Sequence, residues 1–176
     1  MNRWMALLLW LCLVAAHTAF ADKSATDDIL SQNRDALIRL VDLDEYAREY
    51  FAISLGRMNP GWVIADLDGD STNDIALLKR DTAQNKLTLH IYICKQKCQE
   101  VGNVDLGQFN GDQFLAPVKP DQLIHWTEAL PLPDRSQVSE LKLNYFAVEY
   151  FVYGKASIVF FWDPKQKQVN KVVAGD

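Results

Sequence analysis

The spacing of apolar residues between Ser24 and Leu55 has a helical period. These residues recur at steps of three and four, as on one face of an amphipathic helix. Ser24 or Thr26 can cap the start, Gly56 can close the end, and Asp42-Leu43-Asp44 can divide the segment into two helices. We expect the apolar stripe to cover a sheet. Its members are Ile29, Ala36, Leu40, Leu43, Ala47 and Phe51.

After Pro60 the pattern changes to short runs rich in valine, isoleucine and aromatic residues, which is typical of strands. Gly154-Lys155 and Asp163-Pro164 are typical of turns between neighbouring strands. Residues Phe109–Asp134 contain four prolines and weak periodicity, and they are predicted to form mostly a long irregular connection. The expected strands are Trp62–Ala65, Asp74–Lys79, Leu87–Cys94, Leu123–Trp126, Leu141–Asn144, Phe146–Tyr153, Ala156–Trp162 and Val169–Ala174.

These patterns predict an α+β fold in which one N-terminal helix, or two, packs on an antiparallel β-meander. The helical segment 22–56 and the strand-rich segment 57–176 would form a single domain, since their combined length is that of one domain. A run of aromatic residues between 145 and 162 places rings on both faces of one hairpin. Packing in the core is the interpretation favoured for them, with a partner-binding surface as the alternative.

The first residues have the organisation of a secretory signal peptide. A positive start at Arg3 precedes the apolar run Trp4–Ala16, and Ala19-Phe20-Ala21 supplies the small-x-small pattern of a cleavage site. The run is shorter than the roughly 20 residues that span a bilayer. We therefore expect cleavage after Ala21, a periplasmic or secreted mature protein that begins at Asp22, and no transmembrane segment in it.

The charge of the chain disfavours nucleic acid as a partner, and its cysteines bear on the compartment. The formal charge of −5 becomes −6 once Arg3 is removed with the signal peptide, and an acidic protein repels nucleic acid. Cys12 lies within the signal peptide, and it is not preceded by the small residues of a lipoprotein signal. Cys94 and Cys98 remain as an even pair, for which a structural disulfide is predicted in an oxidising compartment, with a redox pair or free thiols as alternatives.

One acidic loop carries most of the candidate chemistry. The segment Asp66-Leu67-Asp68-Gly69-Asp70-Ser71-Thr72-Asn73-Asp74 places carboxylates at positions 1, 3, 5 and 9. Calcium takes six to eight oxygen ligands at about 2.3–2.6 Å. The spacing predicts a calcium site with the ligands Asp66, Asp68, Asp70, Asp74 and the Thr72 carbonyl. The alternative is an acidic turn without a metal.

The segment Gly61–Lys79 resembles the calcium loops of the FG-GAP and VCBS repeat families, in which Asp-x-Asp-x-Asp and a further Asp precede a strand. The resemblance implies a single copy, because the chain is too short for a closed propeller. Ser71 stands where these families have glycine, at a position that favours a positive φ. The later Asn110-Gly111 is interpreted as a type I′ hairpin turn in preference to a second copy.

Catalysis has little support in the residue types. Two histidines remain after signal cleavage: His90, expected to face solvent from a strand, and His125, close to Glu128. The sequence therefore favours an exported, non-enzymatic, calcium-stabilised binding module with a protein or cell-envelope partner. The alternatives are a periplasmic inhibitor or immunity-type protein that neutralises a cell-wall hydrolase, and a hydrolase that uses His125.

Overall fold

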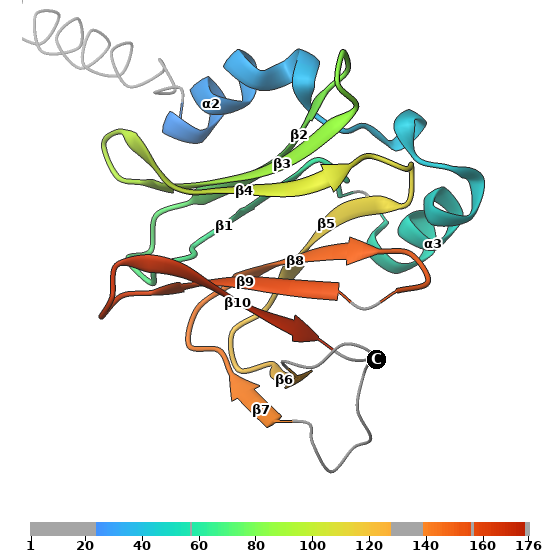
Figure 1. The fold of residues 1–176 in the computed structure, drawn as a ribbon. Helices are drawn as coiled ribbons and strands as arrows, with labels where there is room; N and C mark the ends of the chain where they lie inside the picture. Colours follow the sequence, from blue (N-terminus) through green and yellow to red (C-terminus); the bar gives the residue numbers. More distant parts are fainter. Residues whose placement is uncertain (1–23, 57, 128–138, 156, 175–176) are drawn as a thin grey trace, which may run out of the picture.

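A computed structural model describes residues 24–56, 58–127, 139–155 and 157–174. Within these ranges, two short helices precede ten antiparallel strands, which form two sheets (Figure 1). The α+β class is therefore confirmed, with helix packed on sheet. The predicted signal peptide lies outside the described residues.

The N-terminal segment is helical at its two ends only. Helix α2 spans Ala25–Asn33 and α3 spans Glu45–Leu55, while the 3₁₀ turns η1 (Arg34–Ala36) and η2 (Leu40–Asp42) lie between them. Ser24 caps α2, because its hydroxyl accepts a hydrogen bond from the Asp27 N–H at 3.2 Å. Gly56 ends α3 with a φ of +62°.

The predicted break at Asp42-Leu43-Asp44 is confirmed, and Asp44 is the N-cap of α3. A second interruption at Leu37 and Ile38 was not expected. Both side chains are buried, Leu37 forms an antiparallel bridge with Lys79, and the Ile38 N–H donates to the Leu78 carbonyl at 3.3 Å. Bonding to the sheet replaces helical bonding here.

The first sheet is a meander in the order β1-β2-β3-β4, and the second has the order β5-β8-β9-β10-β6-β7. The expected meander is thus found in β1–β4 and in β8–β10. In the second sheet, however, β5 pairs with β8 on one side of this meander, and β6, with β7 beside it, pairs with β10 on the other side. The strands are β1 Trp62–Ala65, β2 Asp74–Asp81, β3 Lys86–Cys94, β4 Cys98–Gln108, β5 Gln113–Val118, β6 Leu123–Thr127, β7 Ser139–Lys142, β8 Ala147–Val152, β9 Ser157–Asp163 and β10 Gln168–Ala174.

The long irregular connection predicted over Phe109–Asp134 is wrong in its described part, which contains β5 and β6. Asn110-Gly111 is likewise not a hairpin turn, because β4 and β5 belong to different sheets. Of these two residues only Gly111 has a positive φ (+87°), whereas a type I′ turn needs a positive φ at both central residues. The Gly111 carbonyl instead accepts a hydrogen bond from the Asp44 N–H at 2.8 Å. This bond joins the connection between β4 and β5 to the start of α3.

The main core lies between the two sheets and beneath α3. Phe51 of α3 packs edge-on against Phe114, with ring centroids 5.1 Å apart, and Tyr50 stacks on Phe151 at 5.2 Å. Tyr150 and Phe160 are buried in the same cluster, so packing accounts for one face of the aromatic run. Among the described helices, none is long and apolar enough to cross a membrane.

Candidate metal centre

The acidic loop connects the two strands of the β1–β2 hairpin, whose last register pair is Ala65 with Asp74. Asp66 organises its first half. One oxygen, Oδ1, accepts hydrogen bonds from the N–H groups of Gly69 (2.7 Å) and Asp70 (3.1 Å), and Oδ2 accepts one from Ser71 (2.9 Å). The loop is therefore curled around a carboxylate at its first position.

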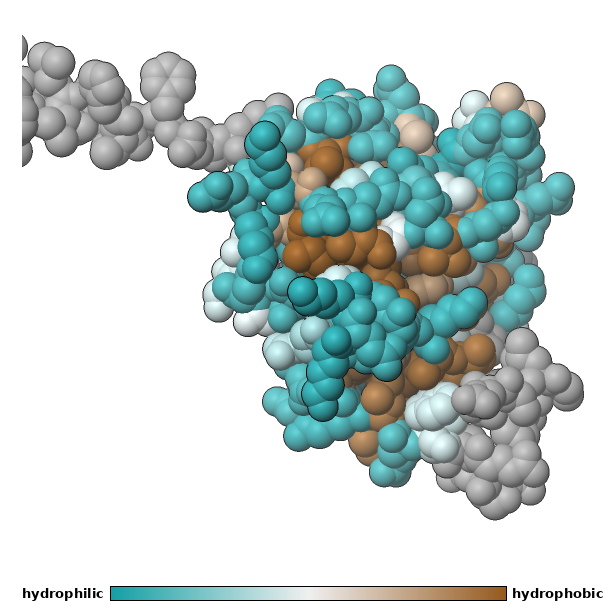
Figure 2. Space-filling view, turned by 60° about the vertical axis from the view of Figure 1, so that its left-hand side comes forward, coloured by the Kyte–Doolittle hydropathy of each residue, from teal (hydrophilic) through white to brown (hydrophobic). Residues whose placement is uncertain are grey.

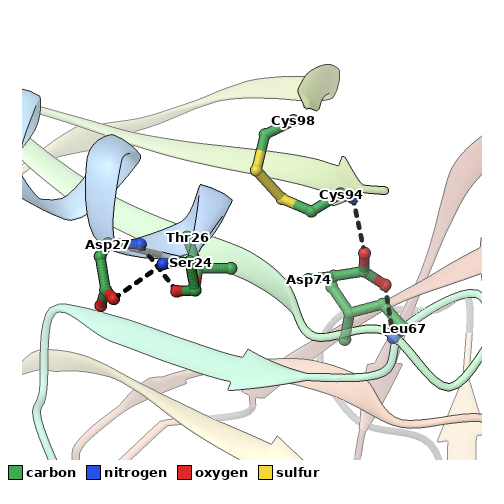
Figure 3. The surroundings of a disulfide bond; sticks show 7 residues. All are labelled: Ser24, Thr26, Asp27, Leu67, Asp74, Cys94 and Cys98. Carbon is green, nitrogen blue, oxygen red and sulfur yellow. Dashed lines mark hydrogen bonds between the residues drawn. A yellow bond between two sulfur atoms is a disulfide. The ribbon is translucent and has the colours of Figure 1, made fainter. Parts of the chain in front are cut away.

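Asp74 fixes the end of the loop from inside the protein. Its side chain is fully buried, its Oδ2 accepts a hydrogen bond from the Leu67 N–H at 2.8 Å, and its Oδ1 accepts one from the Cys94 N–H at 2.7 Å (Figure 3). Burial raises the pKa of the Asp74 carboxyl to about 6 despite these two hydrogen bonds. Each carboxylate oxygen keeps a further lone pair, so both hydrogen bonds leave room for a cation.

Three of the predicted ligands come together. Asp66, Asp68 and Asp74 each place one carboxylate oxygen within 4.8 Å of the other two, which is close enough to hold a metal ion. With ligand distances of about 2.3–2.6 Å, oxygens on opposite sides of a calcium ion lie up to about 5 Å apart, so the spacing fits. Burial also raises the pKa of Asp68. The hydrogen bond that Asp68 accepts from the Asp70 N–H opposes this shift, while the negative charge of the Asp70 carboxylate adds to it.

Asp70 does not belong to this three-carboxylate cluster. Its Oδ1 accepts a hydrogen bond from the Thr72 N–H at 2.8 Å, and its Oδ2 lies 3.4 Å from the Lys95 ammonium. The Thr72 hydrogen bond is the main reason that the pKa of Asp70 is lowered. The roles of Asp70 and of the Thr72 carbonyl as ligands stay predictions.

Two loop residues have the left-handed backbone that a tight curl requires: Gly69 (φ +81°) and Ser71 (φ +68°). Ser71 thus has the positive φ that favours glycine at this position of the loop. Gly69 is also covered by a ring, because a Cβ placed there would lie 2.1 Å from Cε1 of Tyr145. Tyr145 lies between β7 and β8, so this contact joins the loop to the second sheet.

Cys94 and Cys98 form the predicted disulfide, which closes the end of the β3–β4 hairpin (Figure 3). The Cys94 N–H that binds Asp74 lies in this bridged pair. The acidic loop and the disulfide are consequently parts of one end of the first sheet. Lys95, between the two cysteines, forms the ion pair with Asp70.

The histidines are separate from this centre. The prediction that His90 faces solvent is wrong: it is buried, and its ring nitrogens bind Thr88 Oγ1 and Glu100 Oε1, each at 3.0 Å. Burial lowers the pKa of His90. His125 is exposed and its Nδ1 lies 4.0 Å from Glu140 Oε1, while Glu128 is outside the described residues.

Sequence reasoning missed Tyr145 and Lys95 as neighbours of the loop. Lys95 could be suspected from its place in the disulfide loop, but that loop's nearness to Asp70 depends on the pairing of β2 with β3. Tyr145 comes from the connection between two strands of the other sheet, and no local pattern indicates its position over Gly69.

Comparison with family models, curated proteins and solved structures found no match for the chain.

Proposed function

We propose that this protein is an exported, non-enzymatic binding module whose fold is stabilised by a calcium ion in the Asp66–Asp74 loop. The observation that carries the proposal is the position of Asp74. It is a buried carboxylate that belongs to the three-carboxylate cluster and also binds the backbone of Leu67 and Cys94. An ion in the cluster would therefore stabilise both the loop and the end of β3.

The electrostatics of the centre support a cation there. Asp74 has no ion pair among the described residues, and burial makes its charged form costly, as the raised pKa records. The charges of Asp66 and Asp68 lie within 4.8 Å of the Asp74 oxygen and add repulsion. A divalent ion offsets the burial cost and the repulsion together, so ion binding and ordering of the loop are coupled.

Calcium is favoured over magnesium by the ligand chemistry. The cluster supplies carboxylate oxygens from a curled loop of irregular geometry, which calcium accepts, whereas magnesium demands near-octahedral ligands and retains its water. The Cys94–Cys98 disulfide supports the exported location, because such disulfides form in oxidising compartments.

The non-enzymatic part of the proposal is supported by the histidines. His90 is engaged on both ring nitrogens, and the exposed His125 forms its one ion pair within the described part of the chain with Glu140, at 4.0 Å. A general base needs a partner and a sheltered site for the reacting group. The partner of the module is expected to be a protein or another component of the cell envelope.

Isothermal titration calorimetry tests the proposal on protein purified from an exporting host and stripped of metal. Calcium should bind with a stoichiometry of one, and magnesium should bind much more weakly. Asp68→Asn should abolish most of the binding heat, because it removes a charged ligand without changing size. Asp35→Asn is the matched control, since Asp35 is exposed and outside the cluster. Equal heats for Asp68→Asn and the parent protein would refute the assignment of the loop.

A further inference from the structure

Strand β4 has an open edge. It is the last strand of the first sheet and pairs only with β3 among the described strands. The register shifts twice along it, leaving a regular ladder of Gly102–Asp105 opposite Thr88–Ile91. Along these four residues no described strand is hydrogen-bonded to the outer side of β4. Main-chain groups of such an edge can accept another strand.

This edge borders an apolar groove of about 770 Å³ between the two sheets. Val101–Val104 of β4 form one wall, Gln168–Val172 of β10 form the other, and Trp126 and Phe161 contribute aromatic surface. On the face shown in Figure 2, apolar surface lies in bands between rows of polar side chains. The groove thus offers a strand edge and apolar lining side by side.

Gly102 is the point at which the two walls approach each other. A Cβ at this position would lie 3.1 Å from Cγ2 of Val169 on β10. The lack of a side chain lets Val169 of β10 pack closely on the backbone of β4 at this position. The shifts in register on either side limit an added strand to a short ladder centred on Asn103 and Val104.

Among the described residues that line the groove, Lys171 is the one that carries a charge. Its side chain is exposed and forms no ion pair within the described part of the chain. A ligand that carries a carboxylate near this position gains an attraction that a basic ligand does not.

We propose that the groove binds an extended segment of a partner protein, which adds to β4 as a further strand. Side chains at alternate positions of the segment are apolar and enter the groove, and an acidic side chain faces Lys171. The main-chain bonds provide affinity and the alternate side chains provide selectivity. This inference specifies the partner of the binding module and so rests on the function proposed above.

Selection from a random linear dodecapeptide library displayed on phage, with calcium-loaded protein as bait, tests the inference. Enriched peptides should alternate apolar and polar residues and contain Asp or Glu. Lys171→Glu should weaken binding of a synthesised peptide by about fivefold or more, because a charge at the rim is reversed. Lys165→Glu is the control, since Lys165 is exposed in the β9–β10 turn and does not line the groove.

Two further measurements separate strand addition from other binding. Methylating alternate peptide nitrogens should abolish binding in one register and spare it in the other. The amides of Gly102–Val104 should show shifted resonances and slower hydrogen exchange in the complex. Absence of enriched peptides, indifference to Lys171→Glu, protection elsewhere on the protein, or a dimer formed through β4 in place of a peptide complex would each overturn the inference.

Calcium titration of the same samples keeps the two proposals apart. Lys171→Glu should bind calcium as the parent does, because Lys171 is not one of the three clustered carboxylates and the described ion pair of the loop is made by Lys95. If calcium binds and no peptide is selected, only the groove inference fails. If peptides bind to β4 while calcium gives no heat, the calcium part of the proposed function fails and the groove inference stands.

Discussion

The contact between Gly69 and Tyr145 gives a prediction that the structure makes quantitative. Replacing Gly69 with alanine adds a Cβ that would lie 2.1 Å from Cε1 and 2.4 Å from Cδ1 of the Tyr145 ring. The backbone there also has a φ of +81°. The substitution therefore introduces a steric clash and a conformational cost, and the two have different origins.

The two costs can be estimated separately. An L-residue in the left-handed region loses about 1–2 kcal/mol relative to glycine, while overpacking against a neighbour costs about 1–3 kcal/mol. Gly69→Ala should thus lower the free energy of unfolding by roughly 2–5 kcal/mol. In a Tyr145→Ala background the clash is absent, so the same substitution should cost only about 1–2 kcal/mol.

Urea unfolding of the parent, both single variants and the double variant measures this difference. The double variant should be more stable than the sum of the single effects predicts, by about 1–3 kcal/mol. Additivity within about 0.5 kcal/mol would refute the reasoning, because it would mean that the ring does not lie against Gly69. Unfolding with chelator and with calcium should give the same sign of coupling, since the contact is steric.

Three further predictions concern Ser71, His90 and the Cys94–Cys98 disulfide. Ser71→Gly should raise the free energy of unfolding by up to about 1 kcal/mol in urea, because Ser71 has a φ of +68°; no gain, or a loss, would contradict this. His90→Gln should flatten the fall in stability below pH 6.5: burial lowers the pKa of His90, so the unfolded chain binds the proton more readily and the parent loses stability as pH falls. Unfolding curves at pH 7.5 and 5.0 measure the difference, and parallel losses in both proteins would count against it. Replacing Cys94 and Cys98 with serine should cost about 2 kcal/mol by the loop-closure argument, checked by urea unfolding and by a mass two hydrogens higher for the reduced parent.

The sequence was most informative where local pattern decides structure. The helix cap at Ser24, the break before Glu45 and the turn at Gly154-Lys155 depend on neighbouring residues, and the structure confirms them. The aspartate spacing predicted four carboxylate ligands, of which Asp66, Asp68 and Asp74 come together and Asp70 does not join them. The positive φ at Ser71 matches what the resemblance to calcium-loop families implies for that position.

The missed elements depend on the rest of the fold. Strand β4 contains two glycines and two register shifts, so its local sequence has a weak strand signal. Strand β5 contains Pro117, which is tolerated because β5 is at the edge of the second sheet. The burial of His90 also follows from tertiary packing, since its partner Glu100 belongs to β4.

The calcium site itself is the central claim, and anomalous diffraction tests it most directly. Crystals grown with calcium and measured at long wavelength should show one anomalous peak about 2.3–2.6 Å from carboxylate oxygens of Asp66, Asp68 and Asp74. Crystals of Asp68→Asn grown in the same solution should lack this peak. A well-ordered loop without a peak in the parent protein, or a peak held by other residues, would contradict the account.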